Sequence, residues 1–178
     1  MRRAFRRVFV RSRSFGRDKR GATIVEFALL AMPFFLLLCG VLETGVVFFG
    51  SSVLEKATID AARLVRTGQV QTGGMTQDQF KTYICDEIAP LLPCDGLQVD
   101  VEAFDDFSDV TITPPIDANG NLDPNLDNYA TGHAGDVVLV RTFYTWDVVT
   151  PLIGSLLANL SNGKRLLTST AAFRNEPF

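Results

Sequence analysis

The chain has 178 residues, of which 47% are hydrophobic and 21% are charged, and this composition excludes a chain that is disordered throughout. Its net charge of −3 hides an asymmetry, because residues 1–20 hold nine Lys and Arg with one acid, whereas residues 21–178 hold eight basic and nineteen acidic side chains. The acidic body argues against nucleic acid as a partner.

An apolar stretch begins shortly after the basic segment ends. Residues 27–42 include no charged side chain, and after Glu43 and Thr44 residues 45–49 are apolar again. A helix over residues 27–49 would be roughly 35 Å long, and the hydrocarbon core of a bilayer is about 30 Å thick. We therefore expect a membrane-spanning helix rather than a buried core helix. The excess of positive charge places residues 1–20 in the cytoplasm and the body outside.

A cleaved secretory signal is the nearest alternative to a retained span. Such a signal has an apolar run of about 7–15 residues followed by a small-x-small cleavage site. Here the run is longer, and the residues E-T-G-V-V-F-F that follow Leu42 offer no convincing site of that kind. The segment is therefore expected to be retained.

The boundary between the basic and apolar segments reads K-R-G-A-T-I-V-E-F over residues 19–27. A cut after Gly21 would make Ala22 a new N-terminal amine, about one helical turn before Glu26. A carboxylate at the edge of a membrane helix needs a partner, and this amine could pair with Glu26 within one chain or between neighbouring subunits. The alternative is that Glu26 is hydrated at the lipid interface.

This junction resembles the leader of class III, type IV-pilin-like prepilins, and more specifically that of the TadE-like proteins. Those are minor pseudopilins of the tight-adherence (Tad, or Flp) pilus. The similarity continues with Pro33 in A-M-P-F-F-L-L-L, with V-L-E-T-G and with A-T-I-D-A-A-R at residues 57–63. Further similarity lies near the C-terminus, in the segments G-D-V-V-L-V, T-P-L-I-G and L-T-S-T-A-A-F-R-N-E-P-F. Residues 70–130 show no similarity to the family.

The resemblance implies a role in pilus assembly through protein–protein contacts, without a cofactor. It implies a single-pass protein of the inner membrane, with a cytoplasmic N-terminus and a periplasmic or extracellular body. Its partners would be other pilins and pseudopilins, Tad assembly proteins, and a prepilin peptidase that cuts between Gly21 and Ala22. Whether Gly21 is cut, and whether the role is TadE-like, TadF-like or TadG-like, stays open. Residues expected to act in helix assembly are Glu26, Phe27, Pro33, Gly40, Glu43 and Gly45, the two glycines permitting close approach of another helix.

Beyond the membrane the pattern predicts that the helix continues to about residue 67, with Val46, Phe49, Val53, Ala57, Ala61 and Leu64 on its apolar face. Gly68 is the expected stop, and two helices with a break at residues 50–52 are the alternative. A capping box at Thr76 and Gln79 opens a second helix that ends before Pro90.

Alternation and β-branched content predict strands at 97–105, 110–113, 137–144 and 165–173, and Thr150-Pro151 opens a short helix with an apolar face up to Leu160. The fold expected is α+β: a long N-terminal transmembrane helix that continues into a small head with an antiparallel sheet of about four strands. The domains expected are a basic cytoplasmic leader at 1–21, which a cut after Gly21 would remove, a transmembrane and spine helix at 22–67, and an extracytoplasmic α+β head at 68–178.

Cys85 and Cys94 flank D-E-I-A-P-L-L-P in the part placed outside, where a disulfide is favoured over two free thiols. A metal site is not expected, because Cys and His ligands are too few. Residues 117–127 alternate oxygen-bearing side chains. That loop lacks a glycine at the sixth place and a closing Glu, so a solvated, turn-rich loop is favoured over calcium binding.

The sequence contains no recognisable catalytic motif, and His133 is its single histidine. We therefore do not expect an enzyme. An anchored enzyme with its body outside, and a membrane-anchored binding or adhesion module without an assembly role, are the two alternatives to a pseudopilin.

Overall fold

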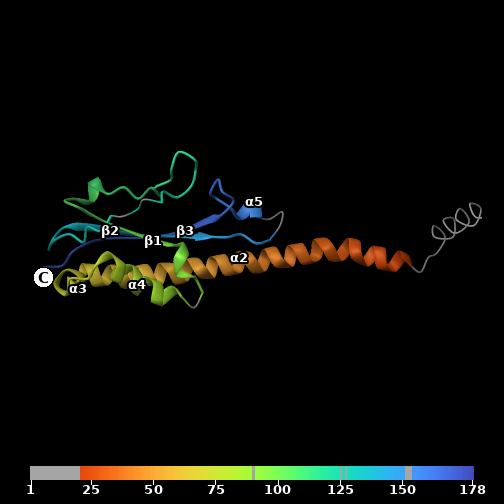
Figure 1. The fold of residues 1–178 in the computed structure, drawn as a ribbon, viewed down its shortest axis with the longest axis horizontal. Coiled ribbons are helices and arrows are strands. Elements are labelled where there is room, and N and C mark those ends of the chain that lie inside the picture. Colours follow the sequence, from red (N-terminus) through yellow and green to blue (C-terminus); the bar gives the residue numbers. More distant parts are fainter. Residues whose placement is uncertain (1–20, 90, 125, 127, 151–153) are drawn as a thin grey trace, which may run out of the picture. The chain divides into compact units, whose positions relative to one another are not determined.

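The computed structural model describes residues 21–178 except 90, 125, 127 and 151–153. The predicted leader up to residue 20, the helix stop at Pro90 and the helix start at Pro151 lie outside the described residues. Two compact units are present, one ending at Val41 and the other comprising Leu42–Phe178. The elements in chain order are α2 (Ala22–Arg66), α3 (Gln69–Gly73), α4 (Gln77–Ile88), η2 (Cys94–Gly96), β1 (Leu97–Phe104), η3 (Phe107–Asp109), β2 (Val137–Trp146), α5 (Gly154–Leu157) and β3 (Arg165–Arg174) (Figure 1).

The α+β prediction is confirmed: a long apolar helix is followed by a small head with an antiparallel sheet. The strand count is corrected from about four to three, in the order β1-β2-β3 among the residues described. Asp100 on β1 stands opposite Arg141 on β2, and Thr142 on β2 stands opposite Ser169 on β3.

The first unit holds the start of α2. The helix is continuous through Pro33, and it is long and apolar enough to cross a membrane. Only 6% of its candidate span is buried within the protein. A core helix of a soluble domain would be mostly buried, so this helix is consistent with the predicted membrane span.

The remainder of α2 forms part of the core of the second unit. Leu54, Ala57, Ala61 and Val65 recur at three- and four-residue steps, and each is at most 1% exposed. The start of the predicted apolar face does not join this core, since Val46 and Phe49 are 40% and 61% exposed. Residues 45–49 are all apolar, so local periodicity could not tell which of them face the core.

The helix shows no break at residues 50–52. The Ser51 hydroxyl donates to the Val47 carbonyl oxygen at 3.1 Å, and the Ser52 hydroxyl donates to the Phe48 carbonyl oxygen at 3.2 Å, so both polar groups are satisfied within the helix. The chain leaves α2 at Gly68, whose φ of 74° suits glycine, as the sequence predicted.

Helix α4 begins with the predicted capping box. The Gln79 backbone N–H donates to the Thr76 hydroxyl, and the Thr76 backbone N–H donates to the Gln79 side chain. Phe80, Ile84 and Ile88 are fully buried, and they join the face of α2 against β1.

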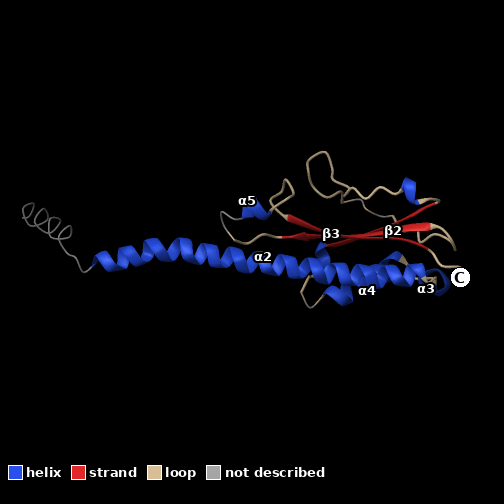
Figure 2. Ribbon diagram, turned by 180° about the vertical axis from the view of Figure 1, so that it is seen from behind, coloured by secondary structure: helices blue, strands red, loops and turns tan. Residues whose placement is uncertain are grey.

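Figure 2 shows α2, α3 and α4 on one side of the sheet, and α5 with the long loop after β1 on the other. On the helix side, Val99, Val101, Val138 and Val140 complete the main core. On the loop side a smaller cluster forms from Leu122, Phe143, Leu160 and Leu166. The open edge of β1 is partly covered, because Val101 exchanges backbone hydrogen bonds with Asn128 and Ala130.

Two predicted elements differ in the structure. Residues 110–113 form a loop instead of a strand, because the Thr111 and Thr113 carbonyl oxygens each accept an N–H from the Arg141 guanidinium at 3.2 Å. Among the described residues, the helix predicted after Thr150 ends at Leu157, before the expected Leu160. Its expected core residue Leu156 is 82% exposed, whereas Leu160 is buried.

Candidate functional site

The predicted cleavage junction lies at the start of α2. Gly21 precedes the helix, Ala22 is its first residue, and both are exposed. A Cβ added at Gly21 would meet nothing within 4 Å. The junction is thus unobstructed by the residues that the structure describes.

The residues expected to act in helix assembly differ in their surroundings. Glu26, Phe27 and Pro33 are exposed, and the Phe27 side chain is 70% exposed. Gly40 is buried, whereas Gly45 is exposed and a Cβ there would meet nothing within 4 Å. Of the two glycines, Gly45 is therefore the one with an open face on which another helix could approach closely.

Glu43 has a partner within its own chain. One carboxylate oxygen accepts the Val149 backbone N–H at 2.6 Å, and the other accepts the Thr150 backbone N–H at 2.8 Å. The carboxylate thus fastens the segment after β2 to α2. The contact joins residues more than one hundred positions apart, so only the fold brings them together.

A cluster of charges, which the sequence analysis missed, lies on the loop side of the sheet. Arg141 donates from Nε to Asp100 Oδ2 at 2.8 Å, and its Nη2 bonds the same oxygen and Glu102 Oε1. The Asp100 side chain is fully buried and that of Arg141 is 7% exposed. The available signal in the sequence was a pair of acidic residues at i and i+2 of one strand and an arginine on a later strand. The register that brings them together could not be read from the sequence.

The surroundings of Glu102 in this cluster shift the pKa of its carboxyl upward. Burial raises the pKa of the Glu102 carboxyl above its ordinary value of 4.5, and the nearby negative charge of Asp100 adds to that effect. The Arg141 guanidinium acts in the opposite direction without cancelling it. The same guanidinium also bonds Thr111 and Thr113, so the cluster anchors the long loop to the sheet.

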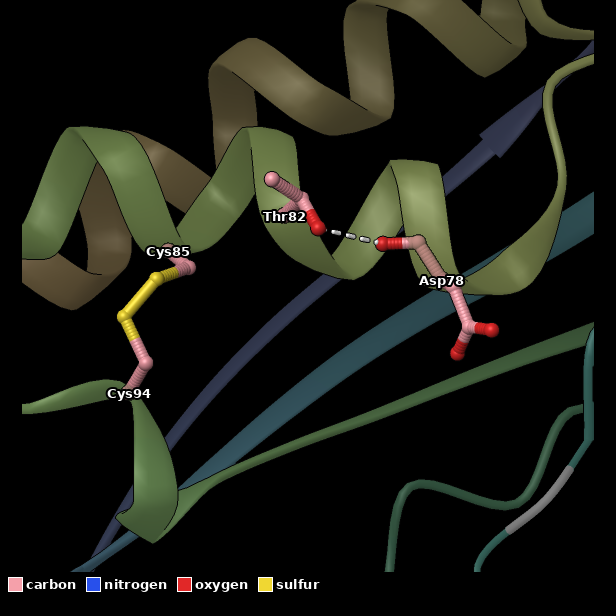
Figure 3. Close-up of a disulfide and its surroundings, with 4 residues drawn as sticks. All are labelled: Asp78, Thr82, Cys85 and Cys94. Atoms are coloured by element: carbon pink, nitrogen blue, oxygen red, sulfur yellow. Dashed lines mark hydrogen bonds between the residues drawn. A yellow bond between two sulfur atoms is a disulfide. The ribbon is translucent and has the colours of Figure 1, made fainter.

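The structure joins Cys85 and Cys94 by a disulfide, with the Cα atoms 5.5 Å apart (Figure 3). The bond links α4 to the η2 turn that leads into β1, and so fixes the helix to the first strand. Cys39, in the first unit, is an exposed free cysteine.

The loop considered for calcium is organised by its own backbone. Asp117 Oδ1 accepts the Asn119 N–H at 2.9 Å and the Asn121 N–H at 2.8 Å. These bonds, that from Asn121 above all, hold the pKa of the Asp117 carboxyl below its ordinary value. Asp127 lies outside the described residues. Within the part of the chain that the structure describes, no three His, Cys, Asp or Glu side chains come together in a way that could hold a metal ion.

His133 lies in the turn before β2, where its backbone N–H donates to Asp136 Oδ2 at 2.7 Å. Its backbone carbonyl oxygen accepts from the buried Asn175 side chain, which also bonds Thr131. These are contacts of the main chain, and they tie the C-terminal segment to the loop that enters β2.

Residues 21–63 match the model of the TadE-like protein family. The matched segment starts at the predicted junction glycine and includes most of α2, so the resemblance stated from the sequence is confirmed over these residues. Neither a comparison with curated proteins nor a comparison with solved structures gave a match.

Proposed function

From the TadE-like segment at residues 21–63, we propose that this chain is a minor pseudopilin-like membrane protein that acts in assembly of a Tad/Flp-type pilus. It would act through helix packing and protein–protein contacts, without catalysis. The N-terminus would lie in the cytoplasm and the head outside the inner membrane. The observation that carries the proposal is that one family match covers both the junction at Gly21 and the apolar part of α2.

The exposed surface of α2 supports a membrane location. Large apolar side chains are exposed on every side of its first half, among them Leu30 at 73% and Met32 at 76%. Each such side chain gains about 1.5–3 kcal/mol on leaving water. A helix that is apolar all round is stable in lipid or against other apolar helices, which are the surroundings of a pilin helix in the bilayer.

Two features of α2 support packing against other pilins. The open face at Gly45 lets a second helix approach closely, which is how helices associate where the solvent is itself apolar. Cleavage after Gly21 would place the new Ala22 amine roughly 6 Å along the helix from Glu26. The exposed Glu26 carboxylate could then pair with its own amine or with that of a neighbouring subunit.

The proposal is tested by pilus assembly in the host. Gly45→Leu fills the open face and Glu26→Gln removes the charge, while Glu55→Gln removes an exposed charge farther along the same helix and serves as the control. We expect Gly45→Leu and Glu26→Gln to lose pili and co-purification with the major pilin, and Glu55→Gln to keep both. Wild-type pili with all three variants would contradict the proposal and favour an anchored module without an assembly role.

A further inference from the structure

The second unit carries apolar side chains that its own core does not use. At the start of this unit, on α2, they include Leu42, Val46, Phe48 and Phe49, exposed by 61, 40, 66 and 61%, and between β2 and β3 they include Val149 and Leu156, exposed by 81 and 82%. We call these six residues the apolar collar. They lie at both ends of the contact that Glu43 makes, because Glu43 follows Leu42 on the helix and accepts the backbone N–H of Val149.

The Glu43 contact fixes Val149, one of the two collar residues after β2, to the helix. Its two hydrogen bonds hold residues 149 and 150 against α2 through their backbone N–H groups, and the Val149 side chain stays exposed. A carboxylate in an apolar stretch is costly unless its oxygens are bonded, and here both oxygens are. The bonded Glu43 is therefore compatible with a position close to lipid, which an unpaired Glu43 would not be.

The length of α2 places its own collar residues at the outer edge of the bilayer. Residues 22–41 form about 30 Å of helix, enough for the hydrocarbon core, so a span that starts at Ala22 leaves residues 42–49 in the outer headgroup layer. A span that starts at Phe27 instead places residues 42–49 in the outer part of the core. Both registers bring lipid to those α2 residues of the collar that a neighbouring helix at Gly45 leaves uncovered.

Polar groups beside the collar suit the headgroup layer. Asp147, two residues before Val149, pairs with Lys164 at 2.9 Å, and their side chains are 75% and 41% exposed. Apolar side chains next to exposed charges form the kind of surface that lies at the boundary between acyl chains and headgroups.

We propose that the apolar collar is a lipid-binding surface, by which the head rests in the outer headgroup layer of the membrane that α2 spans. The inference rests on the membrane span within the proposed function. It adds that the segment after β2, fastened by Glu43, enters the interface together with the helix.

The test uses the full chain in vesicles of phosphatidylethanolamine and phosphatidylglycerol. Cys39→Ala removes the exposed free thiol, and the disulfide protects the other two cysteines. Single cysteines then replace Val149 or Leu156 and carry an environment-sensitive nitrobenzoxadiazole probe. Ile112→Cys, 67% exposed in the same unit, is the matched apolar control, and Leu37→Cys marks the span.

We expect the probes at positions 149 and 156 to emit at shorter wavelength than the probe at 112. Lipids that carry a nitroxide near the headgroup should quench them, and aqueous iodide should not. A probe at 149 or 156 that behaves like the one at 112 would overturn the proposal. Protection that disappears when the chains are diluted to one per vesicle would also overturn it, since a second copy would then cover the collar.

The probe at position 37 separates this proposal from the proposed function. One outcome is that lipids with a nitroxide deep in the acyl chain quench the probe at 37 while no lipid quenches the probe at 149. That result would support the membrane span and refute only the lipid-binding role of the collar. If lipids do not quench the probe at 37, the membrane span is refuted, and with it the basis of the proposed pseudopilin role.

Discussion

Replacing Arg141 by Met tests how the charged cluster stabilises the head. The Asp100 carboxylate is fully buried and accepts three N–H groups, two of them from Arg141 and one from Asn128. Arg141→Met keeps much of the apolar volume of the side chain and removes two of the three N–H donors to the carboxylate, leaving that of Asn128. Water can replace the bonds to Thr111 and Thr113, which are exposed, but it cannot reach Asp100.

Leaving one member of a buried ion pair without its partner costs about 3–5 kcal/mol, a large share of the roughly 5–15 kcal/mol by which domains are stable. With a urea dependence of about 2 kcal/mol per molar, the midpoint of unfolding should fall by about 2 M. The assay is urea unfolding of the detergent-solubilised chain followed by Trp146 fluorescence. Trp146 is the single tryptophan and the last residue of β2, so it reports on the sheet.

The control is the double variant Asp100→Leu with Arg141→Met, which removes both buried charges. Because a buried pair can often be replaced by apolar residues at little cost, the double variant should recover most of the lost stability. A fall of less than about 0.5 M for Arg141→Met, or a double variant as unstable as the single one, would refute the reasoning.

Three further changes test separate features of the head. Cys85→Ala with Cys94→Ala opens a short loop and should lower the free energy of unfolding by about 2–3 kcal/mol, measured by urea unfolding against the oxidised wild type. Gly68→Ala places a Cβ against the Phe178 ring at a φ of 74° and should cost about 1–3 kcal/mol. Phe178→Ala in the same chain should relieve part of that cost, and strictly additive losses would contradict the contact. The raised pKa of Glu102 means that the folded state binds a proton more tightly than the unfolded state, so stability falls as pH rises above about 4.5 and through the folded-state pKa. Glu102→Gln should flatten this fall in urea midpoints taken across that range, and an unchanged slope would show that another group causes it.

Local sequence patterns predicted most of the head because the elements concerned are governed by near neighbours. The capping box at Thr76, the stop at Gly68 and the alternation of β1 each involve residues within a few positions, and all three stand in the structure. The spacing of Cys85 and Cys94 likewise limited their pairing to a short loop. Such signals need no knowledge of the tertiary fold.

The elements that were missed depend on contacts between distant residues. Residues 110–113 have strand-like composition, but Arg141 on β2 takes up two of their carbonyl groups. Glu43 was assigned to helix assembly from the family resemblance, while its bonds to residues 149 and 150 form only in the folded head. Leu156 sits on an apolar helical pattern and yet is exposed, since periodicity shows that a face is apolar and not what covers it.

The N-terminal residue of the chain extracted from membranes tests the assembly account most directly. Intact mass would be measured from the host and from the same host without its prepilin peptidase, with Glu55→Gln as a variant that should not alter processing. The account predicts a chain that begins at Ala22 only when the peptidase is present. A chain that still begins at Met1 in both hosts would contradict it, would leave Glu26 as an interfacial carboxylate, and would favour the anchored module.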